Sequence, residues 1–237
     1  LTVRPESIKH VYLVRVSNTT RVLGPDFKPP RQIGEAASNP RPSLPRTEVS
    51  GLFTIGLDGK NLRCVAEPKG FLRAAHPAWS PNGKMLAFVG FDDTGRDPLI
   101  RVAAVEEGII RVVAAGIAPT WSRDGTRLAY VASGKPDWAT DWADLGRNEE
   151  RIEVLELEGT NPGRITIVAR GLWPRWSPTD DRLAFSARRD ANWDIYLRGS
   201  DGLELRRLTT DPALDTRPLW MPDGRSVVFL SNRVNRW

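Results

Sequence analysis

The sequence predicts an all-β fold, a β-propeller built from four-stranded antiparallel blades. One unit, which reads Pro-x-Trp, then a turn, then a short apolar strand, occurs four times. The tryptophans of the four units lie 42, 55 and 44 residues apart. A four-stranded propeller blade needs a period of about 40–45 residues. Each of the first three units is also followed by a second strand-like hairpin, so each repeat carries four strands.

The four Trp units take up residues 77–89, 119–131, 174–186 and 218–231. Three of them place Asn-Gly or Asp-Gly between two strands, and these residue types tolerate the positive φ of a tight hairpin turn. The third unit has Asp180-Asp181 at this place, where we expect an Asp to adopt the left-handed conformation at some cost. We assign structural roles to the repeated tryptophans, packed between blades, and to the turn glycines: Trp79, Trp121, Trp176, Trp220, Gly83, Gly125 and Gly224.

These units resemble the TolB-type (WD40-like) β-propeller repeats, whose signature is similar to Pro-x-Trp-Ser-Pro-Asp-Gly followed by a strand that ends in Ala-Phe and Ser. The resemblance covers about residues 51–237. It implies the propeller fold and a bacterial envelope or secreted setting. Propellers of this type occur as partner-binding modules, as envelope proteins and as domains attached to hydrolases, so the fold alone does not fix the function.

Further strand-like segments predict the two outer strands of successive blades. They pair 99–105 with 109–113, 151–157 with 164–168, and 194–197 with 205–208. Another hairpin covers 52–57 and 62–65, but its Trp unit is missing or unrecognisable. With a further hairpin at the N-terminus, at 8–16 and 21–23, the sequence contains five outer hairpins but only four Trp units. This count favours five blades, with four or six as alternatives.

The last blade stops after two strands. Residues 231–237 resemble 186–193, after which the third unit continues into the strand Asp194-Ile195-Tyr196-Leu197. The N-terminal segment His10-Val11-Tyr12-Leu13 resembles that strand. We therefore predict that the N-terminal hairpin completes the C-terminal blade and closes the ring, which would remove open sheet edges. A chain cut within a blade is the alternative.

We expect one domain over residues 1–237. Residues 24–50 are rich in Pro and Arg and follow neither the helical nor the strand period, so they are predicted to form an extended loop. An insertion at 135–148 explains the spacing of 55 and is predicted to be a loop or a short helix. A helix there would carry Trp138 and Trp142 beside an acidic stripe formed by Asp137, Asp141 and Asp144.

Composition narrows the class of protein. Apolar residues make up 40% of the chain and charged residues 27%, and no apolar run approaches the roughly 18 residues of a membrane span. The net charge of +5 is dispersed, which does not suggest a nucleic-acid-binding surface. Cys64 is the only cysteine, so no internal disulfide can form. A start at Leu1 suggests a processed chain or a piece of a longer one.

The sequence offers no constellation of catalytic or metal-binding residues. His10 and His76 are the only histidines, and no Gly-x-Ser-x-Gly motif occurs. One Cys and two distant His give no zinc spacing, and the acidic residues at 92–97 lack the order of a calcium loop. We therefore predict no catalytic residue, no metal and no cofactor.

Two functional hypotheses follow. The first is a non-catalytic, TolB-like protein–protein interaction module, periplasmic or secreted, that contacts its partner through the 135–148 insertion and the 24–50 loop. Its candidate binding residues are Trp138, Trp142, Asp137, Asp141 and Asp144, although both Trp rings could instead cover their own blade. The second is a propeller domain of a larger peptidase or hydrolase, or one that binds a glycan or small ligand in the central channel.

Overall fold

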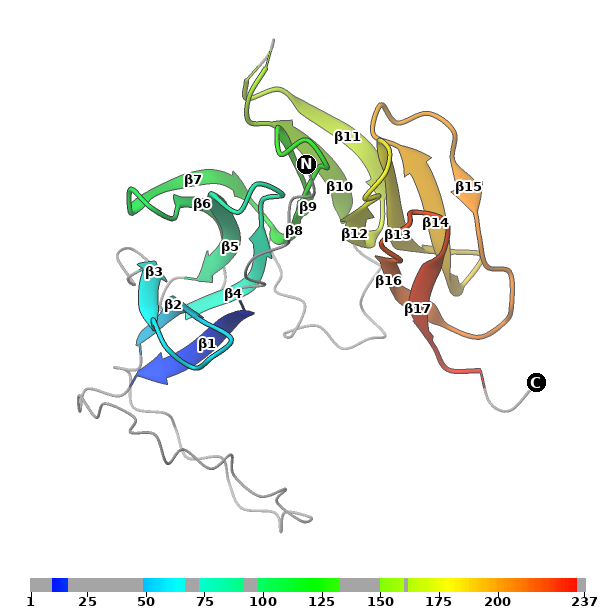
Figure 1. The fold of residues 1–237 in the computed structure, drawn as a ribbon. Coiled ribbons are helices and arrows are strands. Elements are labelled where there is room, and N and C mark those ends of the chain that lie inside the picture. The colour runs from blue at the N-terminus through cyan, green and yellow to red at the C-terminus, as the bar shows by residue number, and fades with distance from the viewer. Residues whose placement is uncertain are drawn as a thin grey trace, which may run out of the picture.

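The computed structural model describes residues 10–16, 49–66, 73–91, 98–132, 150–159 and 162–233, with the backbone alone for 10–16 and 49–50. These residues form an all-β protein of five antiparallel sheets, which confirms the predicted fold class (Figure 1). We call the sheets blades 1 to 5 in chain order.

Blades 2, 3 and 4 each have four strands in sequential order. Blade 2 contains β4 (Arg73–Trp79), β5 (Met85–Phe91), β6 (Leu99–Ala104) and β7 (Ile109–Ala115). Blade 3 contains β8 (Ile117–Trp121), β9 (Arg127–Ala132), β10 (Arg151–Glu156) and β11 (Ile165–Arg170). Blade 4 contains β12 (Leu172–Trp176), β13 (Arg182–Arg189), β14 (Asn192–Gly199) and β15 (Arg206–Arg207). Every Trp unit thus spans the first two strands of its blade.

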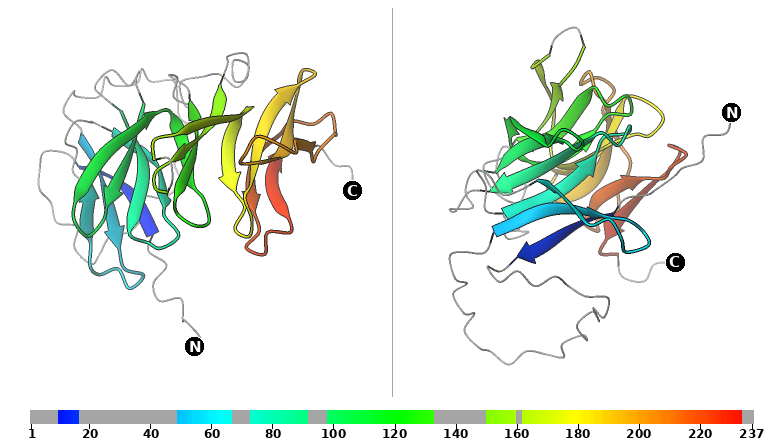
Figure 2. Two further views of the ribbon diagram at one scale, coloured as in Figure 1. Left: turned by 90° about the horizontal axis from the view of Figure 1, so that it is seen from above. Right: turned by 60° about the vertical axis from the view of Figure 1, so that its left-hand side comes forward.

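The two terminal blades have fewer strands among the described residues. Blade 1 contains β1 (His10–Val16), β2 (Val49–Ile55) and β3 (Arg63–Ala66), and blade 5 contains β16 (Asp215–Trp220) and β17 (Val227–Ser231). The blades stand side by side along an arc (Figures 1 and 2). The first strands β4, β8, β12 and β16 contact one another in turn and lie on the inner side of the arc, which is the arrangement of a propeller around its channel.

The hydrophobic core lies between neighbouring blades. One cluster joins blades 1 and 2, a second joins blades 2 and 3 and extends to blade 4, and a third joins blades 3 and 4. The second strand of each complete blade is therefore covered on both faces. On β5 the residues from Leu86 to Val89 are all fully buried, and β9 and β13 follow the same pattern. A continuous apolar run, rather than an alternating one, is what such a strand requires.

The turn between the first two strands is held by hydrogen bonds from the repeat itself. In blade 3 the Ser122 hydroxyl donates to Asp124 Oδ1 over 2.6 Å and accepts from Arg127 N over 2.9 Å. Gly125 then takes a φ of 75°, and the glycines of the corresponding turns in blades 2 and 5 take 69° and 67°.

The turn of blade 4 differs from the prediction, because neither Asp180 nor Asp181 has a positive φ. Instead, the Ser177 hydroxyl accepts from Thr179 N and Asp180 N, both over 3.3 Å. The Asp180 carboxylate accepts from Arg182 N over 3.1 Å. Side-chain hydrogen bonds thus close this turn without a left-handed residue.

The predicted ring closure also differs from the structure. Strand β1 pairs with β2, from His10 opposite Ile55 to Val16 opposite Val49, and does not join blade 5. It holds the place in blade 1 that β5 holds in blade 2. The physical reason is that the inner edge of β2 presents unpaired N–H and C=O groups, which an apolar strand can cover as well as those of β17. Among the described residues blade 5 remains two-stranded, and the number of blades in a full ring stays a prediction.

The 24–50 loop, apart from its last two residues, and the 135–148 insertion lie outside the described residues. In the part of the chain that the structure describes, no helix is long and apolar enough to cross a membrane.

Candidate binding site at the inner strands

The inner strand of each of blades 2 to 5 bends at the residue before the proline of its Pro-x-Trp motif. This pre-proline residue has a φ of 50° to 54° in every blade, although none is glycine: His76, Ala118, Trp173 and Arg217. The pairing with the second strand shifts at the same place in all four blades. A left-handed conformation costs a non-glycine residue roughly 1–3 kcal/mol and persists only where the surroundings enforce it. Such bulges redirect side chains.

The four pre-proline residues line one cavity of about 310 Å³ where the inner strands meet. The residues between Pro and Trp in three blades, Ala78, Thr120 and Arg175, also line it. Blades 2 and 3 contribute mostly small side chains, whereas blades 4 and 5 contribute Trp173, Arg175 and Arg217. A repeated backbone therefore surrounds an asymmetric pocket, which we call the channel pocket.

The channel pocket is cationic. Burial lowers the pKa of the Arg175 guanidinium, and the positive charge of Arg217 lowers it further. An arginine stays protonated in a protein despite such a shift, so both charges persist. Arg175 Nη1 donates to the carbonyl of Pro174 over 3.1 Å. None of the residues that line the pocket is an Asp or a Glu. The arrangement therefore favours an anionic ligand.

Aromatic packing holds one side of the channel pocket in place. The Arg217 guanidinium lies over the Trp173 ring, 4.7 Å from its centroid, and the backbone N–H of Arg217 donates to Ser186 Oγ over 3.0 Å. The Trp173 ring is 4% exposed and packs against Trp193 at 6.0 Å between centroids. A guanidinium fixed on a buried ring loses less rotamer freedom when it binds a ligand.

The repeated tryptophans lie between neighbouring blades, and Trp121 and Trp176 are 7% exposed. Trp121 Nε1 donates to the carbonyl of Ala78 over 2.9 Å, and Trp220 Nε1 donates to that of Arg175 over 3.0 Å. In both cases the acceptor belongs to the preceding blade. Trp79 Nε1 and Trp176 Nε1 are buried and have no hydrogen-bond partner among the described residues.

All of the partner-binding residues predicted from sequence lie outside the described residues. These are all five candidates of the insertion: Asp137, Trp138, Asp141, Trp142 and Asp144. The structure describes only the backbone of His10, in β1, and places His76 in the wall of the channel pocket. Within the described ranges, no three His, Cys, Asp or Glu side chains gather as metal ligands would.

Sequence analysis did not find Trp173, Arg175 and Arg217. A signal was present, because the two variable positions of the x-Pro-x-Trp segment change from blade to blade while Pro and Trp do not. Blades 2 and 3 read His-Pro-Ala and Ala-Pro-Thr there, whereas blades 4 and 5 read Trp-Pro-Arg and Arg-Pro-Leu. Variation within a fixed repeat marks positions that the fold does not need.

The fold and the repeat define the class of protein, a β-propeller of Trp-containing repeats whose inner strands enclose a cationic pocket. A family model, the TolB beta propeller domain, matches residues 108–236, more than half of the chain. The chain belongs to this family, as the sequence resemblance indicated.

One relative in sequence and two solved structures are similar to this chain. The Tol-Pal system protein TolB of Bordetella pertussis is 38% identical over 120 residues, which cover 49% of this chain and 24% of that protein. The structure of TolB from Acinetobacter baumannii superposes with a TM-score of 0.59 at 20% identity, covering 76% of this chain and 42% of that one. An oligogalacturonate lyase in complex with manganese superposes with a TM-score of 0.58 at 19% identity, covering 77% of this chain and 52% of the lyase chain. Likeness at this identity shows the fold alone.

Proposed function

We propose that this chain is a non-catalytic, TolB-like module that binds another protein, and that the channel pocket receives a carboxylate-bearing segment of that partner. One observation carries the proposal. Arg175 and Arg217 converge in a cavity of about 310 Å³ whose lining includes no carboxylate. Guanidinium groups bind carboxylates through paired, charge-assisted hydrogen bonds, so an acidic side chain or a chain terminus fits this pocket.

The repulsion between the two arginines supports this interpretation. Placing the charge of Arg217 beside that of the half-buried Arg175 costs free energy, and an anion bound near both lowers this cost. A partner carboxylate would relieve this cost at the moment of binding. The pocket therefore carries a built-in preference for an anion over a neutral segment.

The relatives support the setting that we propose. Because the TolB proteins are named as members of the Tol-Pal system, we propose an extracytoplasmic location, periplasmic or secreted, for this chain as well. The insertion at 135–148 remains our proposal for a further partner contact, through Trp138 and Trp142 and the acidic residues Asp137, Asp141 and Asp144. A propeller face with a variable insertion is a common place for such contacts.

The alternative is that the chain is a propeller domain of an enzyme or binds a glycan or small ligand. The likeness to an oligogalacturonate lyase keeps that alternative open, but at 19% identity it carries the fold and no residue roles. The channel pocket itself presents binding groups, namely two guanidinium groups, an imidazole and an indole ring.

Calorimetric titration tests the proposal. The probe is a blocked peptide with three consecutive Asp residues, and the matched control peptide has Asn at the same places. We expect the acidic peptide to bind and the control peptide not to bind. Arg217→Gln should weaken binding at least fivefold, since a charge-assisted hydrogen bond contributes roughly 1.5–3 kcal/mol. Raising the ionic strength should weaken binding as well.

Arg225→Gln is the matched control, because it removes the same charge from an exposed turn of blade 5 that does not line the pocket. It should leave the affinity within twofold. Equal losses in Arg217→Gln and Arg225→Gln would show that only net charge matters and would contradict a channel site. Turnover of an oligogalacturonate or a peptide ester that Arg175→Gln abolishes would favour the enzyme alternative.

A further inference from the structure

Arginines of the repeat cover the tryptophans at two of the blade junctions. Arg127, the first residue of β9, places its guanidinium over the Trp176 ring of blade 4, 5.0 Å from the centroid. Arg182, the first residue of β13, lies over the Trp220 ring of blade 5 at 5.6 Å. The molecule itself thus shows which group fits over the tryptophan at such a junction, a guanidinium.

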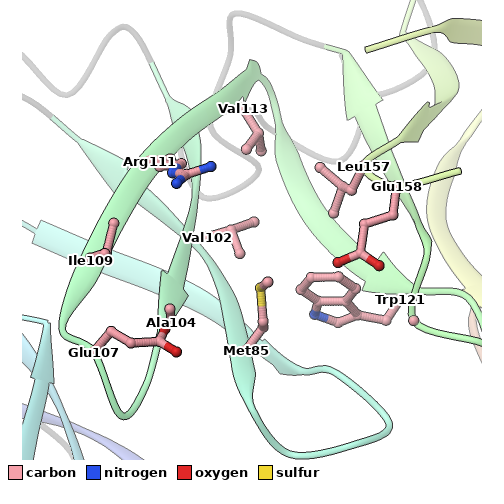
Figure 3. A pocket seen from close by; sticks show the side chains of 11 residues that line it. Met85, Val102, Ala104, Glu107, Ile109, Arg111, Val113, Trp121, Leu157 and Glu158 are labelled. Atoms are coloured by element: carbon pink, nitrogen blue, oxygen red, sulfur yellow. The ribbon is translucent and has the colours of Figure 1, made fainter. Parts of the chain in front are cut away.

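The junction between blades 2 and 3 lacks this arginine. Met85, the first residue of β5, takes the corresponding place beside Trp121 of blade 3 (Figure 3). A cavity of about 330 Å³ opens there, at the lower end of the roughly 300–1,000 Å³ range of ligand pockets. We call it the junction pocket.

The junction pocket has an apolar floor and a charged rim. Its floor is formed by side chains of both blades: Met85, Val102, Val113, Trp121 and Leu157. Glu107 and Glu158 are exposed at the rim, and Figure 3 shows the Glu158 carboxylate pointing toward the Trp121 ring. Arg111 is the one cation in the lining, so the charged side chains around the pocket sum to one negative charge.

We infer that the junction pocket binds an arginine side chain from an exposed segment of a partner protein. The aliphatic stem of arginine suits the apolar floor, and its planar head suits the Glu158 carboxylate and the Trp121 indole ring, which lie side by side in Figure 3. The guanidinium would lie near Trp121 as Arg127 lies over Trp176 and Arg182 over Trp220. That the arginine comes from a protein rests on the proposed function, whereas the chemistry of the pocket does not.

The site is distinct from the channel pocket in both place and charge. The channel pocket lies at the inner strands and has two arginines, whereas the junction pocket lies beside the outer strand β7 and has a negative rim. A partner that engages both pockets would present an acidic segment to the first and an arginine to the second. Each pocket can fail its own test without affecting the other.

Nuclear magnetic resonance of the 237-residue chain tests the inference. The signal is the indole N–H of Trp121, assigned by its loss in Trp121→Phe. The probes are blocked Gly-Arg-Gly and blocked Gly-citrulline-Gly, which have the same shape but differ in charge. We expect a saturable shift with the arginine peptide in the millimolar range and binding at least fivefold weaker with the citrulline peptide.

Three variants then test the geometry. Glu158→Gln should weaken binding about two- to fivefold, as expected for one exposed ion pair, and Arg111→Gln should tighten it. Met85→Arg should abolish binding, because the new guanidinium would lie over the Trp121 ring as Arg127 lies over Trp176 and Arg182 over Trp220. Glu158→Gln leaves the core untouched, so the test holds even if Met85→Arg does not fold.

The inference is overturned if the arginine peptide causes no saturable shift of the Trp121 signal, or if the citrulline peptide binds equally well. Unchanged binding in Glu158→Gln would also overturn it. Loss of acidic-peptide binding in Arg217→Gln, with arginine binding retained, would show that the two pockets act independently.

Discussion

Arg127 allows a quantitative test of how the blades are held together. Its side chain is 20% exposed and bridges blades 3 and 4. The guanidinium lies over Trp176 at 5.0 Å, donates to Asp181 Oδ1 over 2.8 Å, and donates to Ser200 Oγ over 3.0 Å. We choose Arg127→Met as the perturbation, because methionine occupies the corresponding place between blades 2 and 3 and keeps most of the apolar packing.

The expected loss of stability follows from these contacts. The cation–π contact contributes about 0.5–2 kcal/mol. The ion pair adds less than about 1 kcal/mol, since the Asp181 side chain is 68% exposed. The hydrogen bond to Ser200 adds about 0.5–1.5 kcal/mol. Because methionine recovers part of the packing, we expect the free energy of unfolding to fall by about 1.5–3 kcal/mol.

Urea unfolding followed by tryptophan fluorescence measures this change, provided that the denaturant slope stays constant between the variants. The double variant Arg127→Met/Asp181→Asn isolates the contribution of the ion pair. Its loss of stability should be smaller than the sum of the losses in the two single variants. A loss below about 0.5 kcal/mol for Arg127→Met would refute the idea that the arginine ties these two blades together.

Two further predictions follow from single contacts. Trp121→Phe should cost at least about 1 kcal/mol more than Trp79→Phe in urea unfolding, because of these two tryptophans only Trp121 donates from Nε1 to a carbonyl of the preceding blade; equal losses would contradict this. The Arg182 guanidinium, hydrogen bonded to Asp180, lowers the pKa of that carboxyl. The charged carboxylate thus stabilises the fold above its ordinary pKa, and this stabilisation is lost as the carboxylate is protonated at lower pH. Asp180→Asn should therefore flatten the decline of the urea midpoint below about pH 4. An identical decline of the urea midpoint below about pH 4 in the wild type and in Asp180→Asn would show that this pair contributes nothing to stability.

The strands and turns of this fold could be predicted because their signals are local. Each Pro-x-Trp motif and its turn lie within about a dozen residues, and the apolar run from Leu86 to Val89 predicts a strand buried on both faces. The hairpin predicted at 99–105 and 109–113 corresponds to β6 and β7. Local chemistry therefore accounts for the elements of the three complete blades.

The pairing of β1 could not be predicted in the same way. The segment from His10 to Leu13 resembles the third strand of blade 4, but its apolar pattern also fits the edge of β2. Strand pairing depends on which edge is open in the assembled fold, and that is not a property of the strand itself. The segment does form a strand, but the prediction that this strand pairs with blade 5 was wrong.

The channel pocket depends on two features that leave little trace in one sequence. The left-handed conformation at the pre-proline position is counter to the usual preference before proline, which favours extended backbone. The approach of Arg175 to Arg217 then requires two blades to be placed side by side. Both features become visible only when the repeats are aligned and arranged around a common channel.

The bend before each proline also bears on how such a channel can change over evolution. The backbone conformation is shared by four different side chains, from Ala118 to Trp173, so it does not depend on any one of them. An exchange at one of these positions alters the lining of the channel without requiring a new strand path. Ligand preference can therefore be altered one blade at a time, and Ala118 is the natural position at which to introduce a new binding group.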